Sequence, residues 1–491
     1  MTTENVRPNK LPNRLEPKIV PGPDADAELL AKLGYKQELN RALGLFSSFG
    51  VQFSSIAIAS AFYTTAIVGF GFAGPAMIWS FIIGGALQVF FVGLALSELV
   101  SAYPLSGGVY QIIGRITRFR WLAWQTGWWL VIAHTVSVTA VGVSLVPFVA
   151  GWFGIGTLST MQTSLVAVAL IAIVTVINLM GVKAAALMNN LGVSAEIFGI
   201  ALVIGALIFV SHDTQPAQIF TNTAGTTADG WLKPFLFAMI LPAYLISSFD
   251  ATGNAAEETK DAAKIAPLAT FIANISAYVV GLVLITLTVL AIPNVNKLMA
   301  SPTPVKYVFD SALGKNVTDV FQALAVVALI ATMAMLQLTG IRVMWSQARD
   351  GQMPASAWLR KVSRQRVPLN ATIVATALSV VFVFWSSALS VLAAMTALAW
   401  AAAYTVAVIA GFFAVSRGTL PDHPWRLGRA APVIYAVAAV WSVVLCALLV
   451  WSDWKHVGLG MVAVIVVGAV LYRLIPASQR GNPTVGQRSN S

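Results

Sequence analysis

Long apolar stretches separated by short polar connections recur from about residue 44 to residue 475. Runs of about 18 or more apolar residues are long enough to cross the ~30 Å hydrocarbon core of a bilayer as helices. Backbone groups in lipid must be paired within the segment, and no stretch alternates as a barrel strand does, so the pattern predicts an all-α membrane protein. We expect twelve transmembrane helices, at residues 44–70, 76–99, 121–149, 163–181, 190–210, 234–254, 268–292, 318–341, 370–388, 391–413, 432–451 and 457–474.

Two of these spans carry polar interruptions. The sixth ends in Ser-Ser-Phe-Asp-Ala-Thr-Gly at residues 247–253, and the first carries Ser54, Ser55 and Ser60 among small residues. Such residues weaken a helix, and interrupted backbone in a membrane is tolerated only where it lines protein or a water-filled cavity. Paired interruptions in two halves predict a five-plus-five inverted repeat with helices 1 and 6 broken, plus two extra C-terminal helices. For the first span alone, serines that let helices pack closely are the alternative.

Composition and charge agree with a multi-pass membrane protein. The 491 residues are 58% hydrophobic and only 10% charged, against about 25% charged in soluble domains. With the N-terminus inside, 25 of the 30 lysines and arginines fall on the cytoplasmic side. The bias predicts cytoplasmic N- and C-termini in a cell membrane (plasma or inner membrane). It also explains the net charge of +11 without a nucleic-acid partner.

The chain divides into three parts by composition. We expect a polar cytoplasmic tail at residues 1–43, a twelve-helix permease domain at 44–475 and a second cytoplasmic tail at 476–491. The first 43 residues lack the apolar core of a cleavable signal peptide. The single cysteine, Cys446, lies in an apolar span, where a small packed side chain is expected.

Five local patterns are found together in one family of permeases. They are IAIASAFYTT at 56–65 with GFGFAGPA after it, SELVSAYPLSGGVY at 97–110, SSFDATGNAAEETKDAAKIAP at 247–267, TPVKYVFDSALG at 303–314 and GIRVMWSQARDGQMP at 340–354. With this order and spacing, the chain resembles the amino acid–polyamine–organocation superfamily and, within it, the amino acid/choline transporter family. The family usually has glycine at the positions of Ala61 and Ser248, so the substrate of a named relative does not transfer to this chain.

A broken helix offers two kinds of free backbone group. We expect the outer half of span one to begin at Ser60, Ala61 and Phe62, where amides and partial positive charge suit a carboxylate. Carbonyls near Ala57 and Ile58 are expected to face an ammonium group. Span six would add the carbonyls of Ser247 and Ser248. A zwitterionic amino acid fits this arrangement, which is also what the family resemblance implies.

Four further side chains have a functional and a structural interpretation. Phe249 is a candidate apolar lid or an ordinary packed residue. Asp250 could attract an amine, exchange a proton or cap the inner half of span six. Glu196, about two turns into span five, is a candidate proton carrier or a partner of a neighbouring helix. His134 is a second candidate for a proton route or a neutral, hydrogen-bonded residue. Glu257 and Glu258 are interpreted as surface charges.

The sequence predicts a secondary transporter that works by alternating access. The expected substrate is an amino acid or an amino-acid-derived amine such as 4-aminobutyrate, choline or a polyamine, with uptake favoured over exchange. Protons are favoured over sodium because the middle of span eight offers Thr332 without a neighbouring hydroxyl. No cofactor motif, metal-ligand cluster or catalytic constellation is recognised, so no cofactor, metal or enzyme activity is expected. A channel and a membrane-embedded transferase are the alternatives from other classes.

Overall fold

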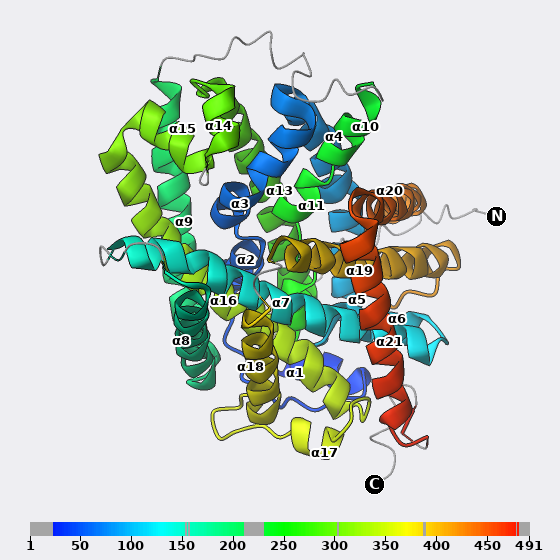
Figure 1. Ribbon diagram of the computed structural model, residues 1–491. Coiled ribbons are helices and arrows are strands. Elements are labelled where there is room, and N and C mark those ends of the chain that lie inside the picture. Colours follow the sequence, from blue (N-terminus) through cyan, green and yellow to red (C-terminus); the bar gives the residue numbers. More distant parts are fainter. Residues whose placement is uncertain are drawn as a thin grey trace, which may run out of the picture.

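The computed structural model describes residues 23–152, 155, 158–210, 230–301, 304–385, 389–477 and 479–480 (Figure 1). Within these residues the chain is helical, and its one β-bridge joins Leu43 to Thr259. The α-helices are α1 (Pro23–Lys32), α2 (Leu45–Ile56), α3 (Ile58–Ala73), α4 (Met77–Leu87), α5 (Leu94–Ala102), α6 (Gly108–Ile116), α7 (Arg120–Trp152), α8 (Thr160–Leu179), α9 (Val182–Ile208), α10 (Leu232–Ala238), α11 (Leu241–Leu245), α12 (Ala251–Asn254), α13 (Ala262–Leu290), α14 (Val295–Ala300), α15 (Pro304–Leu313), α16 (Lys315–Arg349), α17 (Ser356–Leu359), α18 (Leu369–Val383), α19 (Leu389–Ser416), α20 (Ala431–Ser452) and α21 (Leu459–Leu474).

Nine helices in the described part of the chain are long and apolar enough to cross a membrane. Three predicted spans are not among these nine. The first is divided into α2 and α3, the sixth into α10 and α11, and the ninth corresponds to the shorter α18. A multi-pass membrane fold is therefore supported, whereas the total of twelve spans and the inverted repeat stay predictions.

Both predicted interruptions occur, and each contains a left-handed residue that is not glycine. Ala57 separates α2 from α3 with φ of 54°. In the sixth span, residues 246–250 leave the helix after α11, and Ser248 has φ of 57°. A left-handed residue cannot continue a right-handed helix and costs roughly 1–2 kcal/mol when it carries a Cβ. Ser248 is thus held by its surroundings in a conformation that glycine adopts readily.

Helix α16 forms much of the centre of the bundle. It packs against α7, α9, α8 and α2, and its side chains from Ala331 to Ala348 are buried. Glycines permit two of these close approaches. A Cβ on Gly192 of α9 would lie 2.1 Å from the Ala331 Cβ, and one on Gly340 would lie 2.6 Å from the His134 Cβ. His134 on α7 is therefore held directly against the middle of the bundle.

The two ends of the bundle differ in structure. We call the end with α1 and α17 the inner end and the end with α14 and α15 the outer end (Figure 1). The segment after α1 is packed onto the inner end, where the backbone amides of Ala42 and Leu43 donate to the Glu258 carbonyl. Tyr35 and Leu39 are buried there. Part of the predicted N-terminal tail is therefore ordered against the helical domain.

Candidate substrate and coupling site

The two helix interruptions lie against each other. The Ser248 hydroxyl donates to the Ser55 carbonyl at 3.1 Å, which links the unwound part of the sixth span to the last turn of α2. Gln52 makes a second link, because its Nε2 donates to the Ser248 carbonyl at 2.8 Å and its Oε1 accepts from the Thr252 amide at 3.4 Å. These side chains are buried. The sequence analysis did not single out Gln52, although an amide within an apolar helix was a usable signal.

The structure places the start of α3 earlier than the sequence suggested. The helix begins at Ile58, and the Ala61 amide already donates to the Ala57 carbonyl at 2.8 Å. The amides without an acceptor inside α3 are therefore those of Ile58, Ala59 and Ser60. The carbonyls that end α2 belong to the turn before Ala57, and the Ser55 carbonyl accepts the Ser248 hydroxyl. Both sets of backbone groups lie at the predicted break, about two residues earlier in the chain than predicted.

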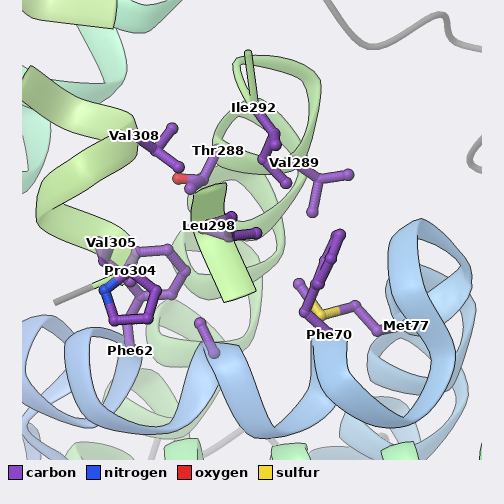
Figure 2. A pocket seen from close by; sticks show the side chains of 11 residues that line it. Phe62, Phe70, Met77, Thr288, Val289, Ile292, Leu298, Pro304, Val305 and Val308 are labelled. Atoms are coloured by element: carbon purple, nitrogen blue, oxygen red, sulfur yellow. The ribbon is translucent and has the colours of Figure 1, made fainter. Parts of the chain in front are cut away.

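Phe62 lines a small apolar cavity on the outer side of the break (Figure 2). The cavity has a volume of about 30 Å³ and lies between α3 and the outer segments α13 to α15. Thr288 is the polar side chain in its lining, which otherwise consists of Phe62, Ala66, Phe70, Met77, Val289, Ile292, Leu298, Pro304, Val305 and Val308. Next to Phe62 in sequence, Ala61 is partly buried. The space beyond the break thus has apolar walls.

Phe249 is packed between α19 and the segment that contains Gly93. Its ring meets the Tyr404 ring edge-on with centroids 5.5 Å apart, and a Cβ on Gly93 would approach the Phe249 ring to 3.3 Å. The ring is fully buried. Of the two predicted roles for Phe249, these contacts correspond to ordinary core packing. Ser247, two residues before Phe249, is also buried, with 9% of its surface exposed.

Asp250 is the centre of a buried polar cluster. The Tyr404 hydroxyl donates to Oδ1, and Asn254 Nδ2 donates to Oδ2 at 2.6 Å. Asp250 precedes α12, but its side chain makes no capping hydrogen bond to that helix. The capping interpretation was therefore wrong, because the carboxylate turns to side chains of α19 and α12 instead of to backbone amides. Two hydrogen-bond donors stabilise a buried carboxylate that would otherwise be costly.

His134 lies beside this carboxylate. Its Nε2 is 3.9 Å from Asp250 Oδ2, and both side chains are almost completely buried. Its Nδ1 lies 2.8 Å from the Leu130 carbonyl oxygen, which can only accept, so Nδ1 carries a proton. In the neutral ring the Nε2 lone pair faces the carboxylate. His134 on α7 and Asp250 in the interrupted span therefore form a close, buried pair of ionisable side chains.

Glu196 is buried deeper in its helix than predicted. Helix α9 begins at Val182, so Glu196 lies 14 residues in, about 21 Å from the helix start rather than two turns. It shares a face with Gly192 and Gly199, whose Cβ positions would meet Ala331 and Leu324 of α16. Glu196 is therefore at the interface of α9 and α16.

The inner end of the sixth span is held by two buried ion pairs. Arg342 Nη2 lies 2.7 Å from Glu258 Oε1, and Arg349 Nη1 lies 2.8 Å from Glu257 Oε2. Glu257 and Glu258 are at most 1% exposed. The surface-charge interpretation of these glutamates was thus wrong. It failed because the arginines that neutralise them lie some 90 residues away in sequence, on α16.

Asp350, at the inner end of α16, continues this network to the N-terminal segment. Oδ1 accepts from the Tyr35 hydroxyl at 2.8 Å, and Oδ2 accepts from the Tyr110 hydroxyl and Gln111 Nε2 at 3.0 and 2.8 Å. Burial raises the pKa of Asp350 from 3.8 to about 6, although these donors and Arg349 oppose the rise. The N-terminal segment, α6 and α16 are therefore joined at the inner end.

The sequence of the chain is similar to those of known proteins. A family model for amino acid permeases matches residues 43–471. The chain is 26% identical to the amino-acid permease BAT1 homolog of Oryza sativa, over 87% of this chain and 88% of that protein. It is 25% identical to amino-acid permease BAT1 of Arabidopsis thaliana, with 88% and 89% covered. An amino-acid permease of Schizosaccharomyces pombe is 27% identical, with 85% and 78% covered. The chain therefore belongs to the amino acid permease family, a family of transporters in the superfamily that its motifs resemble.

Proposed function

We propose that this protein is a proton-coupled secondary transporter that imports an amino acid or an amino-acid-derived amine by alternating access. The observation that carries the proposal is the junction of the two interrupted spans. Unwound backbone at Ala57 and at residues 246–250 lies together in the centre of the helical bundle, with a buried carboxylate and imidazole directly beside it. Backbone interrupted in this way supplies polar groups for a small ligand in an otherwise apolar bundle.

The free ends of the broken helices define the proposed substrate contacts. The first-turn amides of α3, at Ile58 to Ser60, suit the substrate carboxylate, because the helix N-terminus carries partial positive charge. Carbonyls at Ser247 and Ser248 suit its ammonium group. Gln52 already donates to the Ser248 carbonyl, so an ammonium bound there would share or displace this donor. Ala61 and Phe62 would contact the apolar part of the substrate.

Asp250 and His134 are the proposed coupling pair. A gradient biases alternating access when the ion binds one conformation more tightly than the other. Asp250 belongs to the interrupted span, whereas His134 belongs to α7, so movement of the sixth span changes the distance between them. Glu196 is the second candidate carrier. Sodium is less favoured, since Thr332 has alanine and methionine on either side in the middle of α16.

Two experiments in sequence test the proposal. The purified protein is first screened for a rise in melting temperature with amino acids, choline, 4-aminobutyrate and polyamines, because a ligand of the folded state adds stability by mass action. Uptake of the stabilising compound is then measured in proteoliposomes with an imposed pH gradient and no sodium. Ala61→Trp and Ser248→Leu should abolish binding, with Ile373→Met on the exposed face of α18 as a folded control. Uptake that requires sodium and ignores the pH gradient would overturn the proton assignment.

Orientation in a cell membrane forms a second part of the proposal. We place the inner end and both termini in the cytoplasm, because lysine and arginine are concentrated in the segments that lie there. In a Cys446→Ala background, Lys306→Cys should react with an impermeant thiol reagent on intact cells and Arg364→Cys should not. The reverse labelling pattern would invert the orientation.

A further inference from the structure

A second, more polar cavity adjoins His134. It has a volume of about 10 Å³, which is at the lower limit for one water molecule. Helices α7, α16 and α18 line it through His134, Thr135, Val138, Leu336, Gln337, Gly340, Ile341, Ala375 and Ser379. His134 Nε2 is buried and has no hydrogen-bond partner within the described residues. The cavity therefore has the polar side chains of Thr135, Gln337 and Ser379 in its lining beside His134, whose Nε2 lacks a hydrogen-bond partner within the described residues.

Gln337 continues the polar path away from His134. Its Nε2 donates to Thr175 Oγ1 at 2.8 Å and to Thr376 Oγ1 at 3.2 Å, while its Oε1 accepts from Asn178 Nδ2 at 2.9 Å. The two threonine hydroxyls lie 3.1 Å apart. Four polar side chains from α8, α16 and α18 thus form one connected group inside apolar helices. Asn178 and Gln337 are buried and Thr175 and Thr376 are partly buried, so the hydrogen bonds between them stabilise polar groups that would be costly if left unpaired.

The path leads to the inner end. Asn178 is in the last turn of α8, which ends at Leu179. A Cβ on Gly181, in the next turn, would lie 3.8 Å from Gln365 in the segment between α17 and α18. Gln337 lies 12 residues, about 18 Å, before the inner end of α16. The polar group therefore extends from the cavity beside His134 to the last turn of α8.

We propose that this group, with water in the cavity, is a proton route between His134 and the inner end that is separate from the substrate path. The inference deepens the proposed proton-coupled transport and rests on it. In the release step the Nε2–H bond of His134 breaks and an O–H bond to cavity water forms. The proton then leaves along water and the Thr175 and Thr376 hydroxyls. Gln337 is a positioning residue, since its amide orients the hydroxyls without itself changing protonation.

The surroundings of His134 leave few competing proton acceptors. Asp250, from the sixth span, is a charged group 3.9 Å from its Nε2. From α19, Tyr404 reaches Asp250 and Trp400 packs edge-on against the imidazole. None of the residues of α16 and α18 that line the cavity is titratable. Arg342, also on α16, is paired with Glu258. A proton on His134 therefore has two partners, Asp250 and the cavity.

Deuterium exchange at the imidazole Cε1, followed by mass spectrometry, tests the route without a known substrate. This exchange requires access of deuterated solvent to the protonated ring. We expect Gln337→Met and Ala375→Val each to slow exchange at His134 about fivefold or more, while His423 and His456 in the same protein keep their rates. Gln337→Met removes the amide at similar size, and Ala375→Val fills the cavity without removing a hydrogen bond. Ile373→Met on the exposed face of α18 is the matched control.

The outcomes separate this inference from the transport proposal. If His134 exchanges at the wild-type rate in both variants, or if Ile373→Met slows it equally, the route is wrong even if uptake is proton-driven. If Gln337→Met alone fails to fold, Ala375→Val decides. Slowed exchange supports the route even where uptake proves to be sodium-driven, in which case the coupling proposal fails and the proton path remains.

Discussion

Nε2 of His134 lies 3.9 Å from Oδ2 of Asp250, and both side chains are buried. His134 belongs to α7, whereas Asp250 belongs to the interrupted sixth span. Nδ1 of His134 is hydrogen-bonded to the Leu130 carbonyl of the same helix. Because Gly340 has no side chain, α16 packs directly against the His134 Cβ. Asp250 lies in the unwound end of the sixth span, where Tyr404 and Asn254 hold its carboxylate. One partner therefore belongs to a helix and the other to the interrupted span.

Asp250→Asn should abolish uptake driven by a pH gradient and preserve exchange of substrate across the membrane. Asparagine keeps the size of the side chain and can still accept from Tyr404, but it cannot take up a proton. The measurement is the ratio of gradient-driven uptake to exchange in proteoliposomes, with Asp310→Asn at the outer end as the control. If uptake by Asp250→Asn remains proton-driven, Asp250 is not the carrier, and Glu196→Gln becomes the decisive variant.

Ala57→Gly should raise the melting temperature of the detergent-solubilised protein. Ala57 is left-handed with φ of 54°, and removing its Cβ relieves roughly 1 kcal/mol of strain. Ala66→Gly is the matched control, because Ala66 is helical and glycine there should destabilise by about 1 kcal/mol. A fall in melting temperature for both variants would mean that the Ala57 conformation is not strained. Ser248→Gly should change stability less, since relief of its strain is offset by loss of the hydroxyl bond to Ser55.

The sequence predicted the interruptions well and the partners of single residues poorly. Serines, glycine and an aspartate in apolar runs are local signals, so the breaks near Ala57 and Ser248 could be predicted from neighbouring residues alone. The pairing of Glu258 with Arg342 could not, because it depends on how the sixth span packs against α16. Tyr404 was missed for the same reason. It is an ordinary tyrosine in α19 until the fold brings its hydroxyl to Asp250.

Helix boundaries limited the functional prediction in another way. Glu196 was placed near the start of its span, because the apolar run becomes continuous only after residue 190. Helix α9 in fact begins at Val182 and includes Lys183 and two asparagines, Asn189 and Asn190. Polar residues can lie in a helix end that extends beyond the lipid or packs against another helix, as Asn189 packs beside Gly50. Hydropathy therefore locates the spans but not the depth of a residue within its helix.

Arg342→Met should lower the melting temperature strongly, because it leaves Glu258 charged and unpaired in a buried site. Breaking such a pair costs roughly 3–5 kcal/mol, whereas replacing both partners with apolar residues is often close to neutral. The double variant Arg342→Met/Glu258→Leu should therefore recover much of the lost stability. Lys315→Met, which breaks the exposed pair with Asp319, is the control and should leave the melting temperature unchanged. If the double variant is as unstable as Arg342→Met, the loss does not come from an unpaired charge.

Asp350 should make the stability of the inner end depend on pH. Its pKa in the folded protein is raised from 3.8 to about 6, mainly by burial. A raised carboxyl pKa means that the folded state binds the proton more tightly than the unfolded state does. The contribution of Asp350 to stability is therefore greatest below pH 3.8 and is lost as the pH rises through about 6. This is opposite to the usual behaviour of a carboxylate in an ion pair.

We expect the difference in melting temperature between the wild type and Asp350→Asn to change with pH. Asparagine does not titrate, so the melting temperature of the wild type should fall relative to that of Asp350→Asn between pH 5 and pH 7.5. Other groups titrate equally in both proteins and cancel in the difference. Asp319→Asn, at the exposed outer end, should show a constant difference over the same range. A constant difference for Asp350→Asn would mean that the carboxyl is already ionised at pH 5, and that its three hydrogen-bond donors and Arg349 outweigh the cost of burial.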